Sequence, residues 1–193
     1  VVASKQTDFA LGTDTGGSVR VPASFCGLYG IRPSHGRGSL DGVLPLAPSL
    51  DTCGWFAREA SLFRRIAPVL LDWRDSPPPA RVLIAEDAFE LVSEEVRNAL
   101  APVISRLEAL YGTAKPIRPS ARVGFDGGFP AWQRVMQITR GSEAAASHLG
   151  WMRANNPEMG PHFRERFEAG DTYGPFDIAD AMSKRAMIDG HLS

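Results

Sequence analysis

Residues 12–20 read Gly-Thr-Asp-Thr-Gly-Gly-Ser-Val-Arg, and this turn-rich run decides how the chain is interpreted. Two adjacent glycines, Gly16 and Gly17, give the backbone conformations that other residues avoid and let it approach a bound group closely. Successive amides in such a turn can point at one spot, which suits an oxyanion, and the hydroxyl of Ser18 would stand beside that spot. Acyl transfer by a serine nucleophile uses this layout.

Two other glycine-rich motifs do not fit the run. A phosphate-binding Walker loop needs a Lys between its last Gly and the Ser, whereas Gly17 directly precedes Ser18 here. The nucleophile elbow of the α/β-hydrolases, G-x-S-x-G, also fails, because Arg20 occupies the place of its last Gly. On residue chemistry alone, an ordinary glycine-rich turn and a catalytic loop both remain open.

The segments beside the run predict a strand and a helix. A short strand is expected at 9–12, directly before it, and a short helix after Pro22, ended by Gly27 or Gly30. Residues 33–48 have the composition of a long surface excursion. The run therefore connects two regular elements.

The rest of the chain continues this alternation. A helix is expected over 59–71, and strands over 81–85, which should be buried, and over 115–118. An amphipathic helix begins at 93–95, and its apolar face comprises Val96, Leu100, Val103, Leu107 and Leu110. From Pro130 onward the pattern is mostly helical, with breaks expected at Gly141, Pro157, Gly160 and Gly174-Pro175. Strands that alternate with helices predict an α/β fold.

The composition is that of an ordinary globular protein. Hydrophobic residues make up 44% of the 193 residues, charged residues 22%, and the formal net charge is −1, so we expect neither nucleic acid nor a membrane as a partner. No apolar run is long enough to span a bilayer, and no signal peptide is visible. Cys26 and Cys53 are too few for a disulfide framework or a zinc site, so a cytoplasmic location is expected.

The run is part of a longer pattern. Residues 12–30 read GTDTGGSVRVPASFCGLYG, and the chain continues with Arg32-Pro33-Ser34-His35-Gly36, then Ser49-Leu50-Asp51-Thr52, then Gly54 and Phe56-Ala57-Arg58. Over residues 6–71 these segments resemble the amidase-signature family. The resemblance implies an α/β amidase-signature fold, a twisted mixed β-sheet flanked by helices. Residues 1–193 would then be a partial amidase domain, in which 6–71 is the signature segment and 80–193 a helix-rich remainder.

The resemblance also implies a catalytic site. A Ser–cis-Ser–Lys triad performs the chemistry in this family, and Ser18 matches its nucleophile. The oxyanion hole would be formed by the backbone N–H groups of Thr15, Gly16, Gly17 and Ser18. Asp14 and Arg20 would support the loop without carrying protons. Neither a metal nor an organic cofactor is required.

The other two triad members match no residue of this chain. The family's bridging Ser lies in a Gly/Ser-rich loop shortly before the signature, and its Lys lies further upstream, so both would fall before Val1. Lys5 is expected to be solvated, and Lys115 and Lys184 match no motif. Since the chain also starts without Met, we expect it to lack an N-terminal and a C-terminal part of the domain and to be inactive by itself, because a serine without its base is a poor nucleophile.

The implied reaction is hydrolysis of a carboxamide C–N bond to a carboxylic acid and ammonia or an amine, through an acyl-enzyme on Ser18. The expected substrate is a small-molecule amide, and a homodimer is the expected assembly if the protein is oligomeric. Residues 54–58 (GWFAR) and 62–65 (LFRR) resemble the subgroup that contains the indole-3-acetamide hydrolases.

Two alternative functions stay open. The first is a catalytically inactive amidase-like scaffold or receptor, against which the presence of Ser18 argues. The second is the glutaminase subunit of a tRNA-dependent amidotransferase. That subunit has a Gln where this chain has Val21.

The other reactive and aromatic residues have structural interpretations. His35, His148, His162 and His191 share no metal-ligand spacing and are expected to form hydrogen bonds or face solvent. Trp132 with Met136, and Trp151 with Met152, could line an acyl pocket, but helical core packing is the favoured interpretation. Cys26 is expected to be buried and inert.

Overall fold

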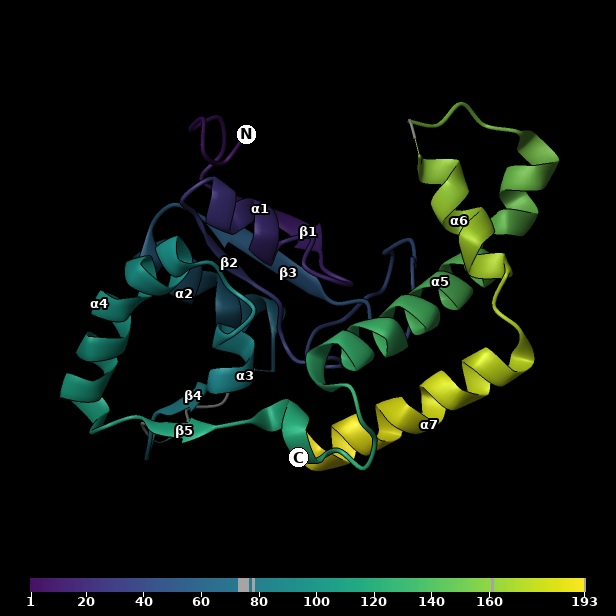
Figure 1. Ribbon diagram of the computed structural model, residues 1–193. Helices are drawn as coiled ribbons and strands as arrows, with labels where there is room; N and C mark the ends of the chain where they lie inside the picture. The colour runs from purple at the N-terminus through teal and green to yellow at the C-terminus, as the bar shows by residue number, and fades with distance from the viewer. Residues whose placement is uncertain (73–76, 78, 161, 193) are drawn as a thin grey trace. The chain divides into compact units, whose positions relative to one another are not determined.

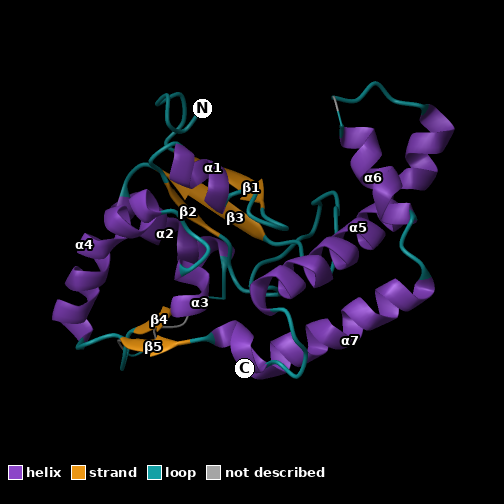
Figure 2. Ribbon diagram, viewed as in Figure 1, coloured by secondary structure: helices purple, strands orange, loops and turns teal. Residues whose placement is uncertain are grey.

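The computed structural model describes residues 1–72, 77, 79–160 and 162–192, and the chain divides into two compact units. The first unit comprises Val1–Asp75 and Thr139–Gly174, and the second comprises Ser76–Ile138 and Pro175–Ser193. Each unit combines short strands or turns with helices, which Figure 2 colours by type. The predicted α/β class, with helices flanking the strands, is confirmed.

A three-stranded antiparallel sheet forms the base of the first unit (Figure 1). Its strands, in spatial order, are β1 (Phe9–Thr13), β3 (Cys53–Ala57) and β2 (Tyr29–Ile31). The strand expected at 9–12 is confirmed. The other two strands lie outside our expectations, because both are short and each contains a glycine, Gly30 or Gly54, which obscures the alternation of apolar residues.

Those glycines make room for the residue that follows the serine. The side chain of Val19 is 0% exposed. A Cβ built on Gly12, Gly30 or Gly54 would lie 3.2, 3.5 or 3.6 Å from one of its methyl groups. Glycines on all three strands therefore leave the space that Val19 fills, and Val19 fixes the chain at the start of α1 (Arg20–Phe25).

The short helix α1 begins earlier than the sequence suggested. Pro22 lies in its first turn, where the missing N–H of proline costs little, so the helix starts two residues before it. The helix ends at Phe25, and Gly27 follows with φ +62°. The expected stop near Gly27 is thus confirmed.

The helix predicted over 59–71 covers the opposite side of the sheet. It forms α2 (Ala60–Leu70), and its Ile66 and Ala67 are buried together with Trp55 of β3. The indole Nε1 of Trp55 donates to the carbonyl of Phe63 at 3.1 Å, so the buried ring satisfies its one polar atom. This is the principal apolar cluster under the sheet.

The first unit also contains the later part of α5 (Gly128–Asn155) and α6 (Phe163–Asp171). The break expected at Gly141 is wrong, since α5 runs through it. A Cβ built on Gly170 would lie 2.0 Å from the carbonyl oxygen of Gly141, so these two glycines let α5 and α6 touch. Gly141 is thus needed for close packing rather than for a turn, while the breaks near 157 and 160 are confirmed.

Two neighbouring side chains of α5, Trp151 and Met152, differ in burial. Met152 is 1% exposed and packs with Ala145 and Leu149, whereas Trp151 is 59% exposed. Core packing is therefore confirmed for Met152 and wrong for Trp151. Apolar burial of this kind stabilises the α5–α6 pair.

The second unit has a two-stranded parallel sheet of β4 (Leu83–Ala85) and β5 (Lys115–Ile117). Its helices are α3 (Glu86–Phe89), α4 (Glu94–Tyr111), the 3-10 turn η1 (Pro119–Arg122), the start of α5 and α7 (Pro175–Leu192). Both predicted strands are present, but β4 is not buried as expected, because Leu83 is 42% exposed. The break at Gly174-Pro175 is confirmed by the start of α7.

The amphipathic helix α4 is confirmed, but its apolar face is exposed. Ser93 caps its N-terminus by accepting a hydrogen bond from the Val96 amide. No described residue of α4 is buried. The predicted apolar face is 38–65% exposed and comprises Val96, Leu100, Val103, Leu107 and Leu110. Among the residues that the structure describes, no helix is both long and apolar enough to cross a membrane.

Candidate active site

Ser18 lies in the turn that links β1 to α1, and its side chain is exposed. The residue before it, Gly17, has φ +120°, a conformation open mainly to glycine. The residue after it is the buried Val19. The serine is therefore presented to solvent between two fixed points of the backbone.

The carboxylate of Asp14 closes this turn from within. It is 0% exposed and accepts hydrogen bonds from the amides of Gly17 at 2.6 Å, Val19 at 3.2 Å and Arg20 at 3.2 Å. Three backbone donors from both sides of Ser18 thus converge on one side chain. A carboxylate that accepts several backbone N–H bonds in this way stabilises one loop conformation.

Arg20 completes the shell of Asp14. Its Nε and Nη2 atoms each donate to a carboxylate oxygen at 3.0 Å, which is a bidentate ion pair. Burial acts to raise the pKa of Asp14, but the hydrogen bonds from the Arg20 side chain and from the amides of Gly17, Arg20 and Val19 outweigh it and lower the pKa to about 2. Asp14 is therefore a fixed anion at neutral pH, and supports the loop without exchanging protons.

A second segment, 49–52, holds the same turn from the side of β3. The amide of Asp14 donates to the carbonyl of Thr52 at 2.9 Å, and the Thr52 hydroxyl donates to the carbonyl of Asp14 at 2.9 Å. The hydroxyl of Thr15 donates to the carboxylate of Asp51, which is buried. The other carboxylate oxygen of Asp51 accepts from the amides of Leu46 at 2.8 Å and Ala47 at 3.0 Å.

Arg32 ties these two segments together. Its Nε donates to the carbonyl of Asp14 at 3.3 Å, and its Nη2 donates to the carbonyl of Leu50 at 2.9 Å. Sequence reasoning assigned no role to Arg32, Asp51 or Thr52. All three lie in the stretches that carry the family resemblance, but their contacts join residues 18 to 38 positions apart, which spacing in the sequence does not reveal.

The amides of the turn differ in what they bind. Gly17 donates its N–H to Asp14, so this amide is not free to bind an oxyanion in this arrangement. In the described part of the chain, no residue accepts a hydrogen bond from the amides of Thr15, Gly16 or Ser18. Of the four donors that the resemblance implies, one therefore braces the loop, and the other three donate to no described residue.

A base for the serine is not found among the described residues. No lysine or histidine there is hydrogen-bonded to the Ser18 hydroxyl. Lys5 is exposed, with φ +62°, and Lys115 is exposed on β5. Lys184 belongs to the second unit, where its Nζ binds a carboxylate oxygen of Asp180 at 2.7 Å.

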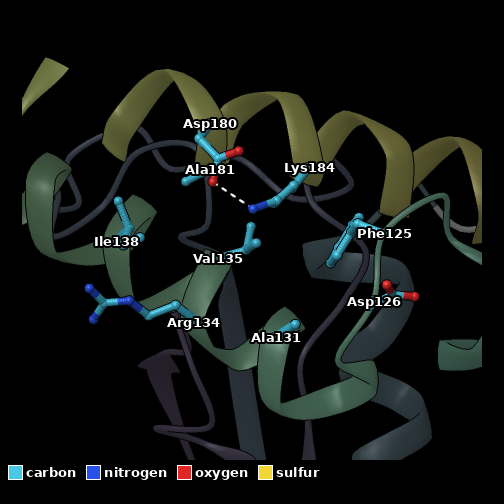
Figure 3. A pocket seen from close by; sticks show the side chains of 9 residues that line it. All are labelled: Phe125, Asp126, Ala131, Arg134, Val135, Ile138, Asp180, Ala181 and Lys184. Atoms are coloured by element: carbon cyan, nitrogen blue, oxygen red, sulfur yellow. Dashed lines mark hydrogen bonds and ion pairs between the residues drawn. The ribbon is translucent and has the colours of Figure 1, made fainter. Parts of the chain in front are cut away.

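The second unit contains a pocket of about 220 Å³ between α5 and α7 (Figure 3). Its wall on α5 is one helical face, formed by Ala131, Arg134, Val135 and Ile138. On α7, the Nζ of Lys184 binds Asp180 one turn earlier on the same helix and lies 5.7 Å from the centre of the Phe125 ring. Neither Trp132 nor Met136 lines this pocket, and its lining contains no serine or cysteine.

Histidine and cysteine side chains hold no metal-binding arrangement among the described residues. His35 and His148 bind the carbonyls of Pro48 and Pro45, which confirms their hydrogen-bonding role. Cys26 is exposed, so the expectation that it is buried is wrong. It is the residue that directly follows the last turn of α1.

The sequence and the fold match known proteins. The family model for Amidase matches residues 1–121. Amidase 1 of Arabidopsis thaliana is 34% identical over an alignment that covers 86% of this chain and 45% of that protein. The pea protein Translocon at the outer membrane of chloroplasts 64 is 33% identical, over 97% of this chain and 35% of its own length.

A crystal structure of an amidase superposes with a TM-score of 0.78 at 28% identity, covering 95% of this chain and 42% of the other. The chain therefore spans less than half the length of the relatives that it matches. The resemblance seen in residues 6–71 and the match of fold agree.

Proposed function

The chain belongs to the amidase family, and from this premise we propose that the complete protein hydrolyses a small-molecule carboxamide to a carboxylic acid and ammonia or an amine, through an acyl-enzyme on Ser18. The observation that carries the proposal is the turn that Asp14 and Arg20 brace: an exposed serine hydroxyl beside unpaired backbone amides. Neither a metal nor an organic cofactor enters this chemistry.

In the proposed reaction, the Ser18 hydroxyl attacks the amide carbonyl and the tetrahedral oxyanion receives hydrogen bonds from the backbone. The amides of Thr15, Gly16 and Ser18 are the donors, while the Gly17 amide stays with Asp14. Backbone donors that are fixed before the reaction stabilise developing charge without reorganisation, and each is worth on the order of 10²–10³ in rate.

None of the described residues is hydrogen-bonded to the Ser18 hydroxyl as a proton acceptor. By the resemblance, a bridging serine would take the proton of Ser18 and pass it to a lysine that is kept neutral by burial. The leaving amine would receive the proton, and water would then release the acid from Ser18. The 193-residue chain without those groups should be inactive, because an unassisted hydroxyl is a poor nucleophile.

A second candidate is an amidase-like receptor or scaffold. The similarity to the pea translocon protein, over nearly the whole chain, supports it. The intact serine turn favours the enzyme, because a receptor has no use for an exposed serine beside unpaired amides. An amidotransferase subunit is less supported, since Val21 replaces the Gln expected there.

The substrate class and setting are further parts of the proposal. The segments 54–58 and 62–65 support the arylacetamide-hydrolysing subgroup. Both cysteines are free thiols and Cys26 is exposed, which suits the reducing cytoplasm, with a homodimer as the proposed assembly. Neither nucleic acid nor a membrane is part of the proposed mechanism.

The test is release of ammonia from arylacetamides by the complete protein, compared with its Ser18→Ala variant. Mass spectrometry after treatment with a fluorophosphonate should find one adduct on the Ser18 peptide, because such reagents capture activated serines. Absence of turnover on a broad amide panel, together with an unlabelled Ser18, would favour the receptor. Turnover that survives in Ser18→Ala would overturn the assignment of the nucleophile.

A further inference from the structure

In the first unit, two side chains of helix α5 form hydrogen bonds with the segment that precedes β3. Both carboxylate oxygens of Glu143 are bound by Ser49: one accepts its amide at 2.9 Å, and the other accepts its hydroxyl. Five residues along the helix, His148 Nε2 lies 2.6 Å from the carbonyl oxygen of Pro45. These contacts join residues 94 and 103 positions apart in the chain.

The segment that α5 binds, residues 49–52, also forms hydrogen bonds with the turn that contains Ser18. In the run Ser49-Leu50-Asp51-Thr52, the first residue binds Glu143 and the next three bind the site. The carbonyl of Leu50 accepts from Arg32, the carboxylate of Asp51 accepts from the Thr15 hydroxyl, and the Thr52 hydroxyl donates to the Asp14 carbonyl. We call residues 49–52 the bridge.

The bridge lies in a segment without regular secondary structure. No helix or strand is formed between β2 and β3, so residues 32–52 depend on side-chain contacts and isolated turns for their order. Segments without regular structure open locally at low free-energy cost unless specific bonds hold them. A glutamate that binds both the amide and the hydroxyl of one bridge residue limits rotation as well as distance.

We propose that Glu143 is a positioning residue for the amide-hydrolysing site, acting through the bridge to fix the Thr15 amide that receives the oxyanion. The proposal rests on the proposed function. Glu143 touches no reacting atom in it. Its effect is geometric, and a displacement of about 1 Å in such a site can cost about 10² in rate.

Three variants of the complete protein separate positioning from general stability. Glu143→Ala removes both contacts with Ser49. Glu143→Gln keeps them, with the side-chain oxygen accepting the Ser49 amide and the side-chain NH₂ donating to its hydroxyl. Asp171→Asn is the matched control, because Asp171 of α6 binds Arg153 of α5 at 2.6 Å, and among the described residues no hydrogen bond joins Asp171 to the bridge.

Two readouts are needed. Hydrogen exchange by mass spectrometry reports the order of the bridge, through the Leu46 and Ala47 amides that Asp51 binds, and of the turn, through the Asp14 amide that binds the Thr52 carbonyl. Steady-state kinetics on an arylacetamide reports kcat and KM separately. Glu143→Ala should speed exchange in both peptides and lower kcat by about 10- to 100-fold with KM changed less than threefold. Glu143→Gln and Asp171→Asn should stay within about threefold of the unaltered protein.

Unchanged exchange at 45–52 and at Asp14 in Glu143→Ala would overturn the proposal, whatever the kinetics. So would equal loss of kcat in Glu143→Ala and Asp171→Asn, since that indicates a general effect on the helix. If the unaltered protein hydrolyses no amide but Glu143→Ala still loosens both peptides, the mechanical link to the turn stands and the proposed enzymatic function is the part that fails.

Discussion

The amide nitrogen of Gly17 lies 2.6 Å from a carboxylate oxygen of Asp14, three residues earlier in the chain. Gly17 makes this contact with φ +120°, a conformation that side chains disfavour, so the turn favours glycine at position 17. Gly17 is one of the four residues whose amides the family resemblance assigns to oxyanion binding. In this structure its amide binds Asp14 and so fixes the geometry of the loop.

Replacing Asp14 by Asn should disable the site. The amide side chain offers one acceptor oxygen where the carboxylate binds three backbone amides and Arg20, so buried donors lose their partners. We expect kcat to fall by at least about 10² and the free energy of unfolding to fall by about 2–3 kcal/mol. Urea unfolding and ammonia release measure both. A variant with normal kcat would show that Asp14 does not shape the catalytic turn.

Acid should destabilise the first unit through Asp14. The pKa of Asp14 is lowered from 3.8 to about 2 on folding, so its stabilising effect is complete above about pH 4 and is lost as the pH falls from 4 towards 2. The size is about 2 kcal/mol. In Arg20→Gln, the largest of the interactions that lower this pKa is removed, so the variant should lose less stability across that window. Urea unfolding at pH 2–5 checks this, and equal pH dependence of the two proteins would contradict it.

A side chain at Gly17 should lower kcat far more than a side chain at Gly27, another glycine with a positive φ. In Gly17→Val, the φ of +120° is unfavourable, and the new Cβ would lie 3.0 Å from the Val21 side chain. The turn must then shift, and kcat should fall by about 10² or more. Gly27→Val is the control, because Gly27 has φ +62° but open space around it. It should lose stability while keeping kcat within about threefold; equal kcat losses would indicate backbone strain alone.

Local patterns predicted the elements that depend on local sequence. The strand at 9–12, the helix over 59–71 and the helix that follows Ser93 all have clear periodicity or caps. The helix break predicted at Gly141 is wrong, because a glycine that ends a helix and a glycine that lets two helices touch look alike in a sequence. The distinction lies in Gly170, 29 residues later.

The candidate site divides in the same way. Ser18 and its neighbours form a contiguous run, so their grouping is visible in the sequence. The partners that fix the run come from distant positions, such as Asp51, 36 residues from Thr15, and Glu143, 94 residues from Ser49. Only the fold brings them together, and no residue pattern encodes which acid meets which amide.

The exposed apolar face of α4 makes a prediction for the chain as expressed alone. Leu107 belongs to the predicted apolar face of this helix, yet it is 38% exposed. A double variant, Val103→Lys with Leu110→Lys, should bind less hydrophobic dye and change the free energy of unfolding by less than about 0.5 kcal/mol per site. Met152→Ala, which opens the buried cluster of α5, should instead cost about 2–5 kcal/mol. Unchanged dye binding in the double variant would mean that the dye reports another surface.

The pairing of β1 with β3 has a consequence for insertions and deletions. The ladder runs from Phe9 opposite Ala57 to Thr13 opposite Cys53, and the Asp14–Thr52 bonds continue it to the edge of the serine turn. Adding or removing one residue there would turn every later side chain to the other face of the sheet. Around Gly42, in an open turn, extra residues cost only loop-closure entropy, which grows slowly with length. Homologous sequences should therefore vary in length near residue 42 and keep the number of residues between Phe9 and Ser18 constant.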